Sequence, residues 1–249
     1  MNKHSFSSNK HSFSSNKHGF SSNKHFLFYD TYERHKKIGG LIKNGETVLD
    51  VGGAANHLSQ FAKPRKIITA NLSGGENSDV IIKGDKLPFK NNSFDVVCSI
   101  DVLEHLPKND RAKFIKELKR VAAKRIILSF PIQTPQHEAY ERQTQEWLQS
   151  KGKDVTYLKE HIKFGLPEKD EILNITKGQK TAMIYSGNTN VNKFLFMLFI
   201  FDPRLKFIRK LTYCAKLVFN LVTNRLFYEI LSNKKFRKSV NRAYLIIEK

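Results

Sequence analysis

The chain has 249 residues, 40% of them hydrophobic, and a formal net charge of +20. This size and composition suit one α/β domain with a buried core and exclude a globally disordered chain. The excess of positive charge favours an anionic partner, such as nucleic acid, anionic lipid or a phosphorylated carrier. Cys98 and Cys214 have neither metal-ligand spacing nor a secreted-type disulfide pattern, which favours a reducing, cytoplasmic location.

Residues 1–25 contain a repeat of seven residues, first seen as NKHSFSS at Asn2–Ser8. Each unit carries one apolar residue, whereas a coiled-coil seam needs two per heptad, so this segment is predicted to be a disordered, solvated tail. Its histidines could capture a metal only weakly, because a mobile tail has no fixed geometry. They are His4, His11, His18 and His25. The ordered domain is expected over residues 26–249.

Strand and helix patterns alternate through the first half of that domain. A helix is expected over Asp30–Lys43, and a second over Asp110–Ala123, where apolar residues lie on one face. Strands are expected at Thr47–Val51, Lys66–Ala70, Val80–Ile82, Phe94–Ile100 and Arg125–Phe130. Strands that alternate with helices predict parallel pairing and a sheet with helices on both faces.

The second half completes the sheet around an insertion. Helices are expected over His137–Ser150 and Glu168–Ile175, and strands over Thr181–Tyr185 and Ala243–Glu248. Residues 188–241 are rich in Phe, Leu, Lys and Arg, and are predicted to form a basic helical cap before the last strand. The expected fold is therefore α/β and Rossmann-like, with a mostly parallel seven-stranded sheet.

Within the insertion, Pro203–Leu231 has apolar residues at helical spacing between lysines and arginines. Two placements are open. The apolar stripe could pack on the domain as a lid, or the helix could lie on an anionic membrane and deliver a lipid-linked acceptor. The longest apolar run, Phe194–Phe201, is too short to span a bilayer, so a membrane-spanning protein is not expected.

The turn after the first predicted strand suits a nucleoside ligand. Asp50 is followed by Gly52 and Gly53, which permit tight backbone dihedrals and keep side chains away from a ligand. The later glycines of a dinucleotide loop are absent, which disfavours a pyrophosphate-bearing cofactor. Asn71 ends the second strand, where a polar side chain would reach ribose hydroxyls. The alternatives are a plain turn residue for Asn71 and a loop brace for Asp50.

Two further stretches make the pattern specific: KGDKLPF at Lys83–Phe89 and NNSFDVVCSIDVLEHLP at Asn91–Pro107. With the glycine loop, they resemble class I S-adenosylmethionine-dependent methyltransferases, in particular the small-molecule family that includes the ubiquinone-biosynthesis O-methyltransferases. The resemblance covers about Val48–Pro131, and the loop departs from the family pattern at Ala54, which stands at the second glycine position. It implies a Rossmann-like methyltransferase fold and S-adenosylmethionine as cofactor. No metal is expected.

The resemblance also implies individual roles. Asp50, Gly52 and Gly53 would hold the methionine end, Asn71 the ribose, and Asp85 with Lys86 the adenine, while Ile100 and Asp101 would line the floor near the sulfonium. The later part, from Phe130 to Pro167, is similar to bacterial methyltransferases found with glycosyltransferases in surface-polysaccharide synthesis. This similarity biases the expected acceptor toward a sugar or a lipid-linked saccharide.

Methyl transfer from a sulfonium mainly needs alignment of the acceptor and exclusion of water. A hydroxyl acceptor also needs a base for its proton, and His105, beside Glu104 after the fourth strand, is the predicted base. His137 and His161 are alternatives, and each of the three histidines could instead be structural. The predicted reaction is methylation of a hydroxyl or carboxyl group of a small molecule, sugar or lipid-linked saccharide.

Two other functions stay open. A nucleic-acid methyltransferase would use the basic cluster at residues 234–238, although Ser99–Val102 lacks the NPPY-type turn common in base methylation. A binding protein that kept the fold without activity is the third possibility, and Asn71 and Ala54 are its only indications.

Overall fold

The computed structural model describes residues 23–53, 57–72, 78–153, 155–200, 203 and 205–249. Most of the N-terminal repeat and Ala54 lie outside these residues. The helices are α1 (Tyr29–Leu41), α2 (Lys108–Val121), α3 (Pro135–Ser150), α4 (Thr156–Phe164), α5 (Lys169–Ile175), α6 (Thr189–Ile200) and α7 (Lys206–Leu231), with short 3-10 helices η1 (Leu58–Gln60) and η2 (Leu103–His105). The strands are β1 (Thr47–Val51), β2 (Lys66–Asn71), β3 (Val80–Ile81), β4 (Phe94–Ile100), β5 (Ala122–Pro131), β6 (Thr181–Ser186) and β7 (Arg242–Glu248).

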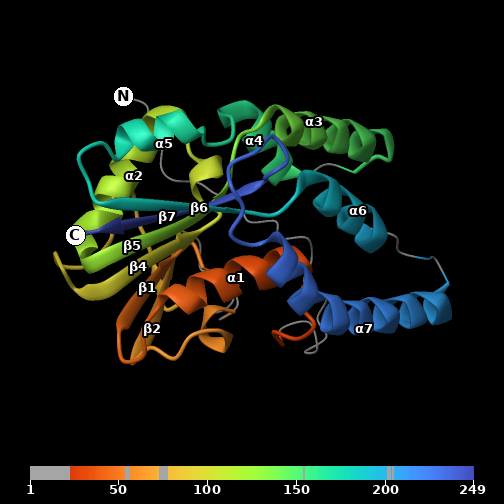
Figure 1. The fold of residues 1–249 in the computed structure, drawn as a ribbon, viewed down its shortest axis with the longest axis horizontal. Helices are drawn as coiled ribbons and strands as arrows, with labels where there is room; N and C mark the ends of the chain where they lie inside the picture. The colour runs from red at the N-terminus through yellow and green to blue at the C-terminus, as the bar shows by residue number, and fades with distance from the viewer. Residues whose placement is uncertain (1–22, 54–56, 73–77, 154, 201–202, 204) are drawn as a thin grey trace.

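Within the described residues, seven strands form one sheet in the order β3-β2-β1-β4-β5-β7-β6 (Figure 1). Strands β1 to β5 pair in parallel, and β7 runs antiparallel between β5 and β6. This confirms the predicted mostly parallel, seven-stranded sheet. The chain order reverses at β1 and β4, which is where open α/β sheets bind ligands beyond the carboxyl ends of their strands.

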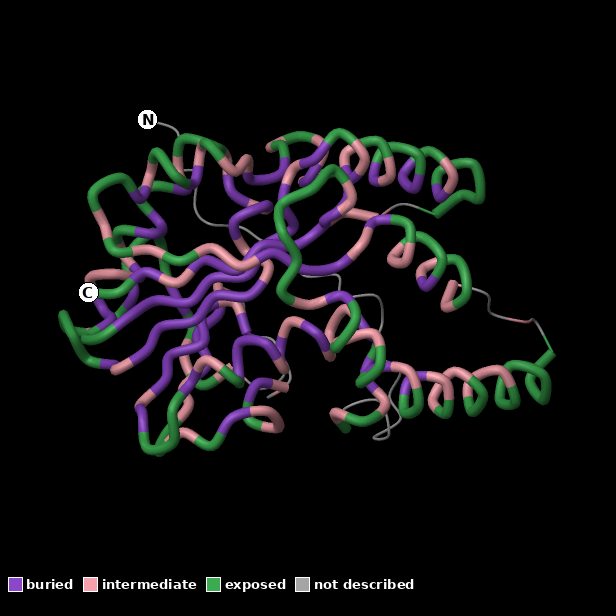
Figure 2. Tube along the Cα trace, in the orientation of Figure 1, coloured by how far each residue is buried: buried purple, intermediate pink, exposed green. Residues whose placement is uncertain are grey.

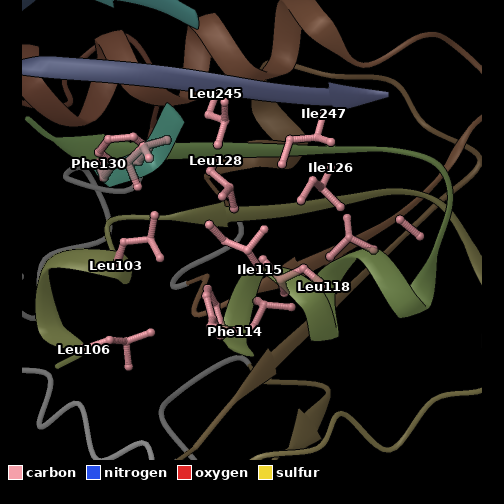
Figure 3. Close-up of a cluster of buried hydrophobic side chains, with 14 of the residues drawn as sticks. Leu103, Leu106, Phe114, Ile115, Leu118, Ile126, Leu128, Phe130, Leu245 and Ile247 are labelled. Atoms are coloured by element: carbon pink, nitrogen blue, oxygen red, sulfur yellow. The ribbon is translucent and has the colours of Figure 1, made fainter. Parts of the chain in front are cut away.

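The core between the sheet and α2 explains the helical apolar spacing that the sequence shows. Phe114, Ile115 and Leu118 of α2 lie against the β5 residues Ile126 and Leu128 (Figure 3). All five side chains are buried. Burial of each such side chain contributes roughly 1.5–3 kcal/mol, so this face fixes α2 on the sheet.

One helix was not predicted. Helix α4 ends at Gly165, whose backbone φ is 72°, and only two of its residues, Leu158 and His161, are buried. The strands and helices that were predicted all occur, and their bounds differ from the expectations mainly at the terminal residues.

The insertion is helical, as predicted, but its apolar stripe does not pack on the domain. Leu211 and Val222 of α7 are 61% and 68% exposed, and the outer side of α7 is mostly exposed or intermediate in Figure 2. The side that faces the domain carries Asn220 and Asn224, whose amides donate to the carbonyl oxygens of Phe26 (3.1 Å) and Leu27 (2.8 Å). The lid placement of the stripe is therefore wrong. No helix in the described parts of the chain is both long and apolar enough to cross a bilayer.

A buried ion network joins α1, β4 and β7 beside the predicted site. Arg242 of β7 is 5% exposed and pairs with Asp101, which follows β4, and with Asp30 of α1 (2.8 Å). Arg34 of α1 also pairs with Asp101. Burial acts to raise the pKa of the Asp101 carboxyl, but the two guanidinium groups outweigh it and hold that pKa well below its usual range.

Replacement of Arg242 should therefore be costly. We expect Arg242→Met to lower the free energy of unfolding by about 3 kcal/mol, because Asp101 and Asp30 lose the more buried of their two guanidinium partners. Urea denaturation followed by circular dichroism measures this loss. The control is Arg142→Met, which removes an exposed pair with Glu138 (3.0 Å) and should cost at most about 1 kcal/mol. Equal losses in the two variants would contradict the network's role.

Candidate active site

A hollow lies at the carboxyl ends of β1 and β2, at the predicted cofactor position. It is lined by Val51, Gly52, Ala70, Asn71, Leu72, Ile82, Gly84, Asp85, Leu87, Val102, Leu106, Phe114 and Glu117. Most of these side chains are apolar, and the polar ones come from the ends of β2 and α2 and from the loop after β3. Such a wall suits a ligand with a flat apolar part and a few hydroxyl groups.

The glycine loop is packed so closely that side chains would not fit. Gly52 has a φ of 82°, and a Cβ there would collide with the side chain of Val102. The Gly52 amide donates to the carbonyl of Ala70 (2.8 Å), which ties the loop to β2. A Cβ on Gly53 would overlap the carboxylate of Asp50, which is 3% exposed. Neighbouring protein atoms therefore exclude a larger side chain at both positions, and the contact of these glycines with the methionine end of the cofactor stays a prediction.

Asn71 lies next to this loop and contacts it directly. Its amide nitrogen donates to the carbonyl of Gly53 (2.6 Å) and to the hydroxyl of Ser78 (2.6 Å). This contact joins the loop after β1 to the end of β2, as the sequence predicted. Asn71 braces the glycine loop, and its contact with a ribose stays a prediction.

The other predicted cofactor residues do not all line the hollow. Asp85 lines the hollow, whereas Lys86 is exposed and outside the lining. Ile100 is buried at the end of β4. Asp101 has a positive φ of 54° and is held by Arg34 and Arg242. Their contacts with a cofactor stay predictions.

The three predicted histidines gather on the other side of the end of β4. The rings of His105, on η2, and His161, on α4, have centroids 4.9 Å apart. Glu141 of α3 lies between two of them, with its Oε1 2.8 Å from His161 Nδ1 and 3.7 Å from His137 Nε2. His137 is also tied to the segment before its own helix, since its Nδ1 lies 3.0 Å from the Ile132 carbonyl oxygen. The sequence named all three histidines, but not the carboxylate that links two of them.

Carboxylates surround this cluster. His105 Nδ1 is 2.7 Å from Glu160 Oε2, an unpredicted partner from α4. Glu104 is 1% exposed, and burial raises its pKa to about 8, with Asp101 adding to the rise. Burial acts to lower the pKa of His161, but the hydrogen bond and charge of Glu141 outweigh it, so that pKa is raised. The positive charges of His161 and Arg242 act to lower the pKa of Glu104 but do not cancel this rise.

Buried contacts fix the turn that carries His105. Leu103 and Leu106, on either side of it, are anchored in the core (Figure 3). The guanidinium of Arg111, which is fully buried, donates to the Leu103 carbonyl (3.1 Å) and pairs with Glu171 of α5 (2.9 Å). The imidazole is thus held on rigid elements, as an acid–base group requires.

Residues 51–130 match the family described as the methyltransferase domain, a segment that runs from the end of β1 nearly to the end of β5. Residues 51–130 therefore form a methyltransferase domain. A search of curated proteins finds no match.

Two solved structures are similar to this chain at low sequence identity, and the first of them supports the fold. A methyltransferase from Thermotoga maritima, described as S-adenosylmethionine-dependent and as a possible histamine N-methyltransferase, is 12% identical with a TM-score of 0.54, covering 91% of each chain. Magnesium protoporphyrin IX methyltransferase from Synechocystis, solved with S-adenosylhomocysteine, is 15% identical over 91% of this chain and 84% of its own, with a TM-score of 0.43. At these identities the likeness concerns the fold alone.

The hollow fits S-adenosylmethionine, the cofactor of this methyltransferase. Gly52 leaves backbone open to the ligand, Ile82 and Leu87 offer apolar surface for a planar base, and Asn71 and Asp85 offer polar atoms for hydroxyl or amino groups. We therefore expect these residues to hold the cofactor.

A matched pair of glycine variants tests this fit. We expect Gly52→Ala to weaken binding of S-adenosylhomocysteine at least about tenfold, equivalent to about 1.4 kcal/mol, because the new methyl group displaces Val102 at the mouth of the hollow. Isothermal titration calorimetry measures the affinity. Gly45→Ala is the control, since Gly45 has the same φ of 82° but open space around its Cβ position. If the two variants bind equally well, the glycine loop does not hold the cofactor.

Proposed function

We propose that this methyltransferase methylates an oxygen of its acceptor, a hydroxyl or carboxyl group of a small molecule, a sugar or a lipid-linked saccharide. The observation that carries the proposal is the His105–Glu160 pair, 2.7 Å apart, beside the end of β4. With Nδ1 bonded to a carboxylate, a neutral imidazole presents Nε2 as the proton acceptor. Between the two oxygen acceptors, this pair favours a hydroxyl, because a carboxylate is already deprotonated at neutral pH.

The chain's residues divide the work of the reaction. When bound, S-adenosylmethionine supplies a methyl group on a positively charged sulfur that departs as a neutral thioether. The glycine loop and Asn71 shape the cofactor side, while η2 places His105 on the acceptor side. As the new oxygen–carbon bond forms and the sulfur–carbon bond breaks, His105 takes the hydroxyl proton and Glu160 stabilises the resulting imidazolium.

Transfer of labelled methyl groups into fractionated cell extract tests the acceptor class. We expect label in saccharide or lipid-linked saccharide fractions, and we expect it to resist mild alkali, because methyl ethers are stable where methyl esters are hydrolysed. Label that a nuclease releases would support the nucleic-acid alternative instead. Label that mild alkali releases would show a carboxyl acceptor and leave His105 without a proton to accept.

With that acceptor in hand, His105 can be tested directly. We expect His105→Gln to lower kcat by about 10²–10⁴-fold, because the hydroxyl proton loses its acceptor, while affinity for S-adenosylhomocysteine stays unchanged. The control is His25→Gln, at an exposed histidine far along the chain from η2. A His105→Gln enzyme with full kcat would show that the base lies elsewhere.

We also infer that α6 and α7 contact an anionic membrane surface. On α7, Phe207 is 79% exposed and Val222 68% exposed, and the helix carries five basic residues against one acidic residue. Exposed apolar side chains among lysines and arginines are typical of helices that lie in the interface of anionic bilayers. Such contact would bring the enzyme to a lipid-linked acceptor.

Vesicle sedimentation tests the membrane contact. We expect binding to anionic vesicles, weaker binding to neutral ones, and loss of binding in Leu211→Asp/Val222→Asp, whose side chains are exposed and so leave the fold intact. The matched control is Leu173→Asp, at an exposed leucine of α5 (42%). Equal, negligible sedimentation with both kinds of vesicle would rule the contact out.

A further inference from the structure

We propose that Glu104, His105 and His161 bind a divalent transition-metal ion on the acceptor side of the cleft. Each offers one ligand atom, and these atoms all lie within 4.8 Å of one another. Glu104 and His161 are buried, at 1% and 7% exposure. The resemblance that identified the cofactor predicted no metal, so this site goes beyond the methyltransferase activity itself.

Two unsatisfied atoms point to a missing ligand. Within the described residues, Glu104 Oε2 and His161 Nε2 are buried without a hydrogen-bond partner. An unsatisfied buried polar atom costs about 1–3 kcal/mol, and here both atoms belong to the same three-residue cluster. A cation held by both would satisfy them together and would supply the positive charge that the buried Glu104 carboxylate needs.

The surroundings of the histidines match those of metal ligands. His161 Nδ1 is bonded to Glu141 (2.8 Å) and His105 Nδ1 to Glu160 (2.7 Å). A carboxylate on one nitrogen fixes the tautomer and the ring orientation and makes the other nitrogen a better metal ligand. Each imidazole would therefore coordinate the ion through Nε2.

The ligand set selects the kind of ion. Imidazole nitrogens suit Zn²⁺, Co²⁺, Fe²⁺ and Ni²⁺, whereas Mg²⁺ prefers oxygen ligands and retains several waters. Two histidines and one carboxylate should thus favour a transition metal over Mg²⁺. Three protein ligands also leave at least one coordination position open for an acceptor oxygen.

The role of the ion, unlike the site, rests on the proposed function. An acceptor hydroxyl bound at the open position would lose its proton more easily, because a metal ion stabilises the alkoxide. With the ion bound, His105 is a metal ligand and cannot act as a free base. The metal ion then promotes loss of the hydroxyl proton in place of the imidazole. The two modes differ in one observable, the effect of a chelator on methyl transfer.

Cobalt titration of the full-length, untagged chain tests the site. The starting protein carries His4→Asn, His11→Asn, His18→Asn and His25→Asn, so that the repeated histidines do not contribute. We expect one Co²⁺ per chain with visible ligand-field absorption, displaced by Zn²⁺ but not by an equal concentration of Mg²⁺. No absorption band, or a band that Mg²⁺ removes as readily as Zn²⁺, would overturn the proposal.

Variants assign the band to these residues. In the same background, His161→Asn should abolish it, and Glu141→Gln should weaken Co²⁺ affinity about 10–100-fold through the lost support of His161. The control is His35→Asn, at a buried histidine of α1 whose Nδ1 bonds the Thr31 carbonyl (2.7 Å). Unchanged binding of S-adenosylhomocysteine shows that each variant is folded. A band that survives His161→Asn would place the cobalt elsewhere.

Labelled methyl transfer after chelation separates the site from the proposed function. Activity lost with the chelator and restored by Zn²⁺ or Co²⁺ supports the role of the ion. Full activity in metal-free protein that binds Co²⁺ would overturn that role and leave the oxygen acceptor standing. Cobalt binding with no label in any hydroxyl-bearing fraction would instead reject the acceptor class and keep the site.

Discussion

The parallel pairing of β1 with β4 is the constraint on which the site depends. Val51 pairs with Ser99, so the chain leaves both strands at the same edge of the sheet. The Ser99 hydroxyl donates to the Val51 carbonyl (2.9 Å) and fixes this register where it matters. As a result the glycine loop and the turn carrying His105, far apart in sequence, face one cleft. A shift by one residue would turn the buried side chains of either strand to the opposite face.

Charge compensation divides that cleft into two environments. Asp101 is partly buried and Glu104 almost fully buried, and the pKa of Asp101 is lowered whereas that of Glu104 is raised. The difference comes from Arg34 and Arg242, whose guanidinium groups contact Asp101. Asp101 is therefore a structural anion that joins α1 and β7 to the sheet. Burial raises the pKa of the Glu104 carboxyl, so its ionisation is less favourable than that of Asp101.

The sequence predicted the strands closely because each is a short apolar run between turn residues, and β1 and β4 have the predicted bounds. It missed α4 because that helix has only nine residues and one of its two buried side chains, His161, is polar. For α7 the sequence showed the apolar stripe, but not whether that stripe faces the domain or the solvent. Spacing reveals which residues share a face, whereas Asn220 and Asn224 decide which face meets the domain.

The position of the insertion links its surface to the chemistry. Helix α6 lies beside α3, joined by a hydrogen bond from Gln136 to Asn190 (2.8 Å), and α7 lies beside α1, where the Tyr29 hydroxyl donates to the Phe227 carbonyl (3.2 Å; Figure 1). Helix α3 also carries Glu141, and α1 carries Arg34, one of the two arginines that pair with Asp101. The exposed apolar helices therefore pack on α3 and α1. Since Glu141 of α3 bonds His161, the proposed membrane contact through α6 involves the direct neighbour of the helix that supports the histidines.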